Sequence, residues 1–205
     1  SKILRAGLNI DTNGDVWTLL QGELNFASQG LSTGLEVKKW SGADGHQITL
    51  SNPQIYSAGK HKYFSAFGIR KADNKMYISY REVPTGLQGQ EYDLVITIWD
   101  SNLQFLNRKE FILEFPAADD PAELHHTKFH DGVVDSNGNF AVGGYYCYDR
   151  WYEAPPDIQY TQRLFYPVIM KFDESLNQIF QYVSGSATPM TTSISFVEKM
   201  EVRLE

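Results

Sequence analysis

The sequence predicts an all-β fold made of three four-stranded antiparallel units. The first observation is a repeated pattern: an apolar, β-branched run, a turn rich in Asn, Asp and Gly, and then an alternating run. It occurs three times, in AGLNIDTNGDVWTLLQGE (6–23), SAFGIRKADNKMYISYRE (65–82) and HDGVVDSNGNFAVGGYYC (130–147). The turn residues Asn13, Asp73 and Asn137 lie about sixty residues apart. An aromatic content of 14%, with 12 Tyr, suits such a β-rich chain.

A second landmark follows each of these stretches and supplies two more strands. Trp40, Trp99 and Phe172 occupy equivalent places in LEVKKWSGADGHQITL, LVITIWDSNLQFLN and PVIMKFDESLNQIFQY. Each unit therefore contains a strand, a tight turn, a strand, a long loop, a strand, a tight turn and a final strand. We expect one domain over residues 1–205, with units at about 4–52, 63–115 and 129–184 and C-terminal strands within 191–204.

This repeat indicates the blades of a complete or partial β-propeller, because a blade is a four-stranded antiparallel sheet. Leu94–Trp99 and Val168–Met170 are apolar on both faces, which suits strands covered by a neighbouring sheet on each side. A closed propeller usually needs four or more blades. Three arrangements stay open: a fragment of a longer propeller, a ring completed by a second copy or a partner, and a compact non-propeller β domain.

The segments VVDSNGNFAVGGYY and PVIMKFDESLNQIFQY resemble the blade repeats of bacterial β-propeller proteins, of the delta-sixty type written D-x-N-G-N, V-G-G and K-[FW]-D. DTNGDVW is similar to the D-x-x-G-x-L-W repeat of sensor propellers. The resemblance covers about four fifths of the chain; the second unit departs from it, with Lys71-Ala-Asp-Asn at the turn. It implies an architecture and favours an extracellular or cell-surface location, but it implies no particular activity.

Composition and charge argue against two classes of partner, nucleic acids and membranes. A net charge of −7, with no run of Lys or Arg, argues against a nucleic-acid partner. No apolar stretch is long enough to span a membrane, so membrane insertion is not expected. The lone Cys147 excludes an internal disulfide.

The predicted loops divide into two sets. Tight turns fall at one end of each unit, and long loops at the other, at about 24–33, 53–62, 83–92, 116–128 and 148–164. The richest segment, 148–166, supplies the candidate contacts for a glycan or protein partner: Arg150, Trp151, Tyr152, Tyr160 and Arg163. Planar aromatic rings beside charged groups suit such contacts. The alternative is that Trp151 and Tyr152 fold back as a lid over the third unit.

Two segments resemble half of a calcium loop, with oxygen-bearing side chains at alternate positions: Asp11, Asn13 and Asp15, and Asp135, Asn137 and Asn139. Gly14 and Gly138 stand where a hairpin turn needs glycine, and no bidentate Glu follows at the required spacing. We therefore favour Asx turns over calcium sites, and expect no cofactor and no metal.

These observations favour a non-enzymatic binding or assembly module, with homo-oligomerisation as one possibility. One alternative is a hydrolase or lyase acting on a carbohydrate or ester with acids in a central channel; another is a structural subunit of a larger assembly. No nucleophile elbow or sialidase-like box is present, so we assign no catalytic residues.

Overall fold

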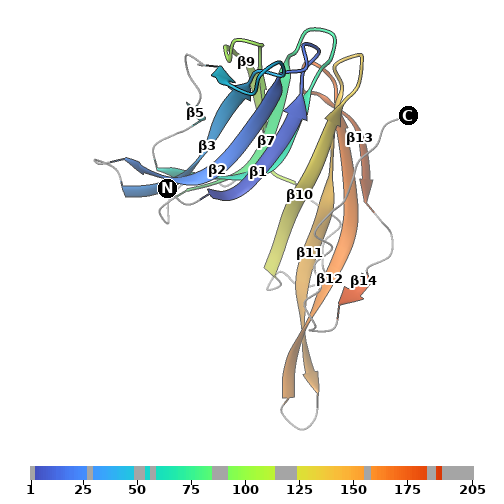
Figure 1. The fold of residues 1–205 in the computed structure, drawn as a ribbon. Coiled ribbons are helices and arrows are strands. Elements are labelled where there is room, and N and C mark those ends of the chain that lie inside the picture. The colour runs from blue at the N-terminus through green and yellow to red at the C-terminus, as the bar shows by residue number, and fades with distance from the viewer. Residues whose placement is uncertain are drawn as a thin grey trace.

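The computed structural model describes residues 3–26, 30–48, 54–55, 59–84, 92–113, 124–154, 158–183 and 188–190. The described residues form three antiparallel sheets and no helix (Figure 1). The first sheet contains β1 (Ile3–Ile10), β2 (Val16–Phe26), β3 (Gly30–Trp40), β4 (Gln47–Ile48) and β5 (Gln54–Ile55). The second contains β6 (Lys60–Ile69), β7 (Met76–Pro84), β8 (Tyr92–Trp99) and β9 (Phe105–Phe111). The third contains β10 (Leu124–Val134), β11 (Phe140–Ala154), β12 (Ile158–Phe172), β13 (Gln178–Val183) and β14 (Thr188–Met190).

Each sheet is a meander in which consecutive strands pair, in the orders β1-β2-β3-β4, β6-β7-β8-β9 and β10-β11-β12-β13. Short additional strands pair at the same edges, with β5 on β3 and β14 on β12. The predicted fold class, three four-stranded blade-like units, is confirmed. No closed propeller forms among the described strands, and the predicted strands within 191–204 lie outside the described residues.

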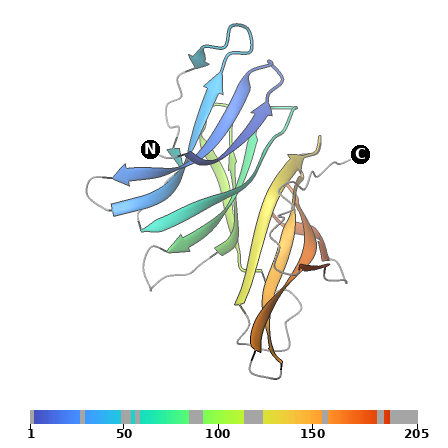
Figure 2. The same ribbon diagram turned by 60° about the horizontal axis from the view of Figure 1, so that its bottom comes forward.

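The second sheet is the middle layer, and it is covered on both faces. Successive residues of β7 enter opposite cores: Met76 and Ile78 pack towards the first sheet, and Tyr77 packs towards the third. In β8, Val95 packs with the first core while Leu94 and Ile96 pack with the second. Two-sided burial explains why the Leu94–Trp99 run is continuously apolar. Figure 2 shows the three sheets side by side in this order.

Repetition extends to irregularities of the backbone. The first strand of the second sheet has a register shift between Phe64 and Ala66, and that of the third has one between Phe129 and Asp131. Phe64 lies opposite Tyr80, and Phe129 lies opposite Gly144, so the two bulges occupy the same place relative to the following tight turn. The side chains of β6 and β10 therefore alternate between the two faces in the same way from the bulge to the tight turn.

The segment predicted as a long loop at 148–164 is instead mostly paired strand. β11 and β12 pair continuously from Phe140 opposite Phe172 to Ala154 opposite Ile158. In Figure 1 this pair runs well beyond the other strands as a projecting ribbon. The 24–33 loop prediction was also wrong in extent, because β2 continues to Phe26 and β3 begins at Gly30. Strand pairing satisfies backbone groups that a loop would leave to water, which favours continued pairing wherever the chain permits it.

Candidate functional site

Six tight turns gather at one end of the molecule, called here the tight-turn end: residues 11–15, 41–46, 70–75, 100–104, 135–139 and 173–177 (Figure 1). Four of them begin with an aspartate whose Oδ1 accepts hydrogen bonds from the backbone of the turn, namely Asp11, Asp100, Asp135 and Asp173. The Asx-turn geometry expected from the sequence is therefore present.

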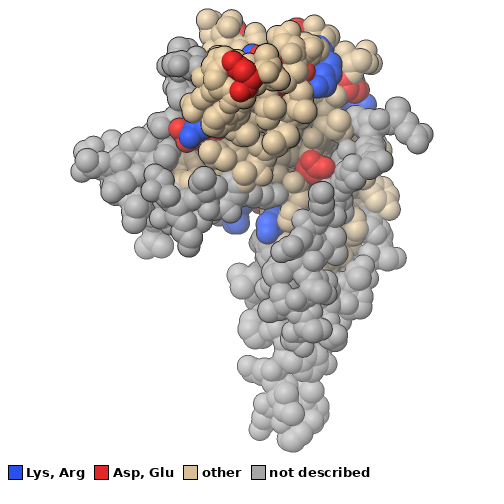
Figure 3. Space-filling model, viewed as in Figure 1, with Lys and Arg blue, Asp and Glu red and all other residues tan. Residues whose placement is uncertain are grey.

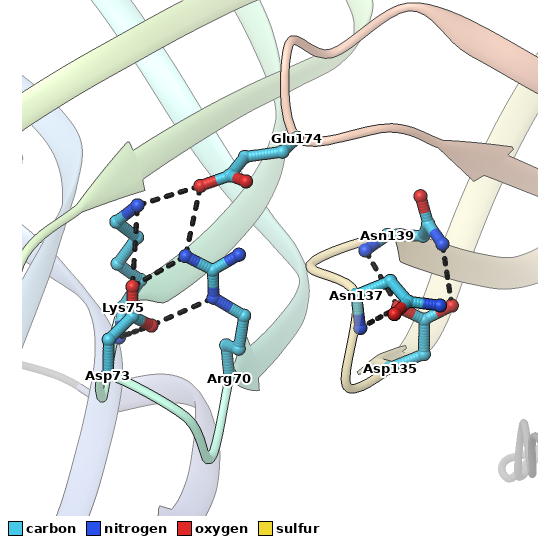
Figure 4. Close-up of polar contacts among 7 residues, drawn as sticks. All are labelled: Arg70, Asp73, Lys75, Asp135, Asn137, Asn139 and Glu174. Carbon is cyan, nitrogen blue, oxygen red and sulfur yellow. Dashed lines mark hydrogen bonds and ion pairs between the residues drawn. The ribbon is translucent and has the colours of Figure 1, made fainter.

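The turn at Asp135 shows how completely such a carboxylate is used (Figure 4). Its Oδ1 accepts the backbone N–H groups of Asn137 and Asn139, each at 2.9 Å. Its Oδ2 accepts Asn139 Nδ2 at 2.7 Å and lies 3.0 Å from Lys171 Nζ. Burial acts to raise the pKa of Asp135, but the bonds from Asn139, Lys171 and Asn137 lower it to about 2.

Asp11 is engaged in the same way. Its Oδ1 accepts the backbone N–H groups of Asn13 and Asp15, and its Oδ2 accepts Trp17 Nε1 at 2.9 Å. Lys39 Nζ lies 3.3 Å from Asp11 Oδ2 and 2.9 Å from Asp15 Oδ2. These carboxylate oxygens hold the turn and a lysine together. Within the described ranges, no group of three or more His, Cys, Asp or Glu side chains is arranged to hold a metal ion.

The second unit replaces the leading aspartate of its first turn with Arg70. Arg70 donates Nε to Asp73 Oδ1 at 2.8 Å and Nη2 to Asp73 Oδ2 at 2.5 Å, so the ion pair closes the turn in place of an Asx motif. The hydrogen bonds from Arg70, opposed by burial, lower the pKa of Asp73 to about 2. The second unit departs from the repeat pattern at this turn, and the Arg70–Asp73 ion pair replaces the hydrogen bonds of the missing leading aspartate.

Contacts at the tight-turn end also join neighbouring sheets. Glu174 Oε1 accepts Arg70 Nη2 at 2.9 Å and Lys75 Nζ at 2.7 Å, so a turn of the third sheet is tied to a turn of the second (Figure 4). Thr12 donates its backbone N–H and its hydroxyl to Asn74 Oδ1, each at 3.1 Å, which ties the first sheet to the second. The charged groups here pair with one another, which indicates that this end fixes the angle between sheets.

Away from the tight-turn end, a cluster of buried charges lies in the second sheet. Glu82, fully buried, accepts Lys60 Nζ at 2.6 Å and Arg108 Nη2 at 3.0 Å, and it also accepts Lys62 Nζ. Lys62 is 1% exposed and lies over the ring of Tyr80. Burial acts to raise the pKa of Glu82, but the three cations lower it to about 2, while burial lowers the pKa of Lys62.

Sequence reasoning did not find this cluster, because Lys and Glu normally indicate surface positions. The alternation of β7 contained the only signal: Glu82 stands two residues after Tyr80, on the same face as the apolar Ile78 and Met76. The described geometry pairs these charges closely with one another, as in a structural ion cluster.

The five candidate contact residues lie on the projecting ribbon. Tyr152 is opposite Tyr160 in the register, and Trp151 is opposite Thr161. Arg150 is opposite Gln162, and Arg163 is opposite Asp149. Alternation therefore puts Arg150, Tyr152 and Tyr160 in one set of alternate positions and Trp151 and Arg163 in the other. The side chains of these residues lie outside what the structure describes.

Among the described residues, the outer part of the ribbon consists of two strands. β10 pairs with β11 as far as Asp149, and β14 pairs with β12 from Phe165 to Arg163. Beyond these points, from Arg150 to Ala154 and from Ile158 to Gln162, the described strands pair only with each other. A two-stranded ribbon is marginally stable in water without a third strand or a packed face.

No protein-family model matches the chain, and no curated protein matches it either. None of the described elements is a helix capable of crossing a membrane.

Proposed function

We propose that this chain is a non-enzymatic binding and assembly module, that the outer ribbon of β11 and β12 makes its partner contact, and that it acts outside the cell. The observation that carries this proposal is the ribbon itself. Residues 150–154 and 158–162 project beyond the three-sheet body and have no further strand beside them among the described residues.

Two physical features of the ribbon support a partner. Its edges offer backbone N–H and C=O groups to an added strand, which is the basis of β-augmentation by an extended protein segment. Its sequence, RWYEA followed by IQYTQ, concentrates aromatic and arginine residues of the kind that dominate protein interfaces. We favour a protein partner over a glycan on the first ground, since a glycan makes no use of strand edges.

The test compares the full chain with a variant carrying Trp151→Ala and Tyr152→Ala. A matched control carries Tyr63→Ala and Phe105→Ala, because both of those aromatic side chains are exposed on the body, at 40% and 55%. Binding is measured against immobilised cellulose, chitin and peptidoglycan. Protein contacts are captured from the protein mixture of the source cells with a photo-crosslinking residue at position 152, and adducts are identified by mass spectrometry.

We expect the ribbon variant to lose at least about tenfold in affinity for the captured protein, as for interface hot spots, with little change in melting temperature. The control variant should bind like the parent chain. An unchanged affinity together with a large fall in melting temperature would show that Trp151 and Tyr152 form a lid. Binding to a polysaccharide alone would move the proposal to a glycan partner.

The hydrolase or lyase alternative has a separate test. Turnover of generic glycoside and lactone substrates by the parent chain, with loss on substitution of an acidic residue, would favour it. The buried acid Glu82 is held by three cations, which is typical of a structural role and does not favour a proton-transferring one.

A further inference from the structure

The face of the first sheet that points away from the second sheet, called here the back face, exposes large apolar side chains. The register places Leu8 opposite Thr18 and Ile10 opposite Val16, while Trp17, on the other side of the same strand, is fully buried towards the second sheet. Leu8 is 66% exposed and Ile10 is 46% exposed. Figure 3 shows a largely uncharged surface over β1 and β2.

The equivalent positions in the other two sheets pack against a neighbouring sheet. Counting back from the tight turn, Ile10 corresponds to Ile69 in the second sheet and to Val134 in the third. Ile69 is 4% exposed within the core between the first and second sheets, and Val134 packs against the next core. Leu8 corresponds to Phe67, which is 6% exposed in the same core as Ile69.

In the strands after the tight turn, the positions equivalent to back-face residues of the first sheet are also buried in the other sheets. Val16 corresponds to Met76 and Phe140, both of which are fully buried against the preceding sheet. Trp40 corresponds to Phe172, which is also fully buried there. The back face of the first sheet thus has the register and the apolar side chains of a blade joint, and no described sheet covers it.

We infer that the back face of the first sheet seats the third sheet of a second copy of this chain. The docking surface on the third sheet is its face away from the second sheet, called here the front face. It includes Ile169 and the roughly half-exposed Phe180 and Tyr182, which lie opposite Lys171 and Ile169 in the register. This face corresponds to the one that buries Leu94 and Ile96 in the second sheet.

A second copy fits because one chain carries both halves of the joint, a back face at one end of the stack and a front face at the other. Such a contact joins different surfaces, and it either closes into a ring or continues into a filament. Two copies supply six blades, within the range of closed propellers, and closure covers both the back face and the front face of each copy. A ring of two copies also agrees with the expectation that a closed propeller needs more than the three blades of one chain.

The internal joints predict one specific contact across the new one. At Gly7 of the first sheet an added Cβ would lie 3.6 Å from Phe67 Cβ of the second, and at Gly132 of the third it would lie 2.9 Å from Ala66 Cβ of the second. Asp131 occupies in the third sheet the place that Ala66 occupies in the second, since each follows the shared bulge. By this repetition, Leu8 of one copy lies against Asp131 of the other.

The test is the molar mass of the full chain in solution, by light scattering over about 1 to 100 µM, since association depends on concentration. We expect twice the mass of one chain. Leu8→Glu puts a carboxylate against Asp131 of the second copy and should weaken association at least tenfold. Leu8→Lys pairs with the same Asp131 and should stay dimeric. Ile112→Glu, at a 58% exposed position outside the back face, is the matched control and should also stay dimeric.

A monomer at every concentration overturns the inference, as does a dimer that Leu8→Glu leaves intact. Equal dissociation by Leu8→Glu and Leu8→Lys would keep Leu8 in the joint and overturn its contact with Asp131. A mass that grows without limit overturns the closed ring. The Trp151→Ala and Tyr152→Ala variant should remain dimeric, so failure of the ribbon as a binding site and failure of this joint are distinguishable.

Discussion

Glu82→Gln is the sharpest perturbation of the interior, because it removes one charge and keeps the shape of the side chain. The carboxylate has no exposed surface and holds Lys60, Lys62 and Arg108. Lys62 is itself 1% exposed, so without Glu82 a buried ammonium group loses its partner. Leaving one member of a buried ion pair alone is far more costly than the net stabilisation that the pair provides.

The magnitude follows from the pKa. The pKa of Glu82 falls from an ordinary 4.5 to about 2, and one pKa unit corresponds to about 1.4 kcal/mol, so ionised Glu82 contributes about 3 kcal/mol to folding. Because the folded pKa lies below the unfolded one, this contribution is complete above pH 4.5 and is lost as the pH falls towards 2. At neutral pH, Glu82→Gln should cost about 3 kcal/mol, or about 6 to 12 °C in melting temperature for a chain of this size.

The assay is urea unfolding followed by tryptophan fluorescence, at neutral pH and at steps down to about pH 3. Glu110→Gln is the matched control, since Glu110 binds the same Arg108 from a 36% exposed position and should change the unfolding free energy by less than about 1 kcal/mol. A cost for Glu82→Gln no larger than that for Glu110→Gln would refute a stabilising role of the Glu82 charge, and so would an unchanged loss of stability between pH 4.5 and 3.

Two further predictions concern the tight-turn end. Gly138→Ala should destabilise the chain more than Gly14→Ala in urea unfolding. Both glycines have φ near +80°, but only at Gly138 does the added Cβ meet a side chain, 2.4 Å from Arg70 Nη1. Equal effects would show that backbone strain alone matters. Glu174→Ala should lower the urea midpoint slightly at low salt and should not change it at about 1 M NaCl. The ion pairs of Glu174 with Arg70 and Lys75 are partly exposed, so salt screens them, and an effect independent of salt would contradict this prediction.

The strands that carry the architecture were predictable because burial on both faces leaves a direct trace in the sequence. Leu94–Trp99 has no polar face, and the structure places it in the middle sheet with a core on each side. The tight turns were equally readable, since the Asp135 turn needs a short acceptor at its start and a residue with positive φ at Gly138. The turn signal arises from contacts within a few residues, and the strand signal arises because burial on both faces requires an apolar residue at every position.

The ribbon and the charge cluster were not predictable for a different reason. Pro155-Pro156 and the polar residues around them indicated a long loop, and only the register shows that Asp149–Ala154 continue β11. Lys62 and Glu82 look like surface residues until β6 and β7 are paired and covered by the first sheet. The ribbon depends on pairing between β11 and β12, and the charge cluster depends on residues 20 to 26 positions apart, and periodicity within one segment reveals neither.

The ends of the sheets therefore have different physical roles. At the tight-turn end, most turn carboxylates hold their own turns, and Glu174 ties the third sheet to Arg70 and Lys75 of the second. Away from it, β11 and β12 leave the stack and lose their neighbouring strands. A rigid stack that fixes its own angles at one end and projects an unsupported ribbon from the other has the construction of a scaffold for contacts. The back face, exposed at Leu8 and Ile10, offers a further contact to a second copy. Two joints between sheets form within the chain, and each end of the stack presents one of the two surfaces that a third joint needs.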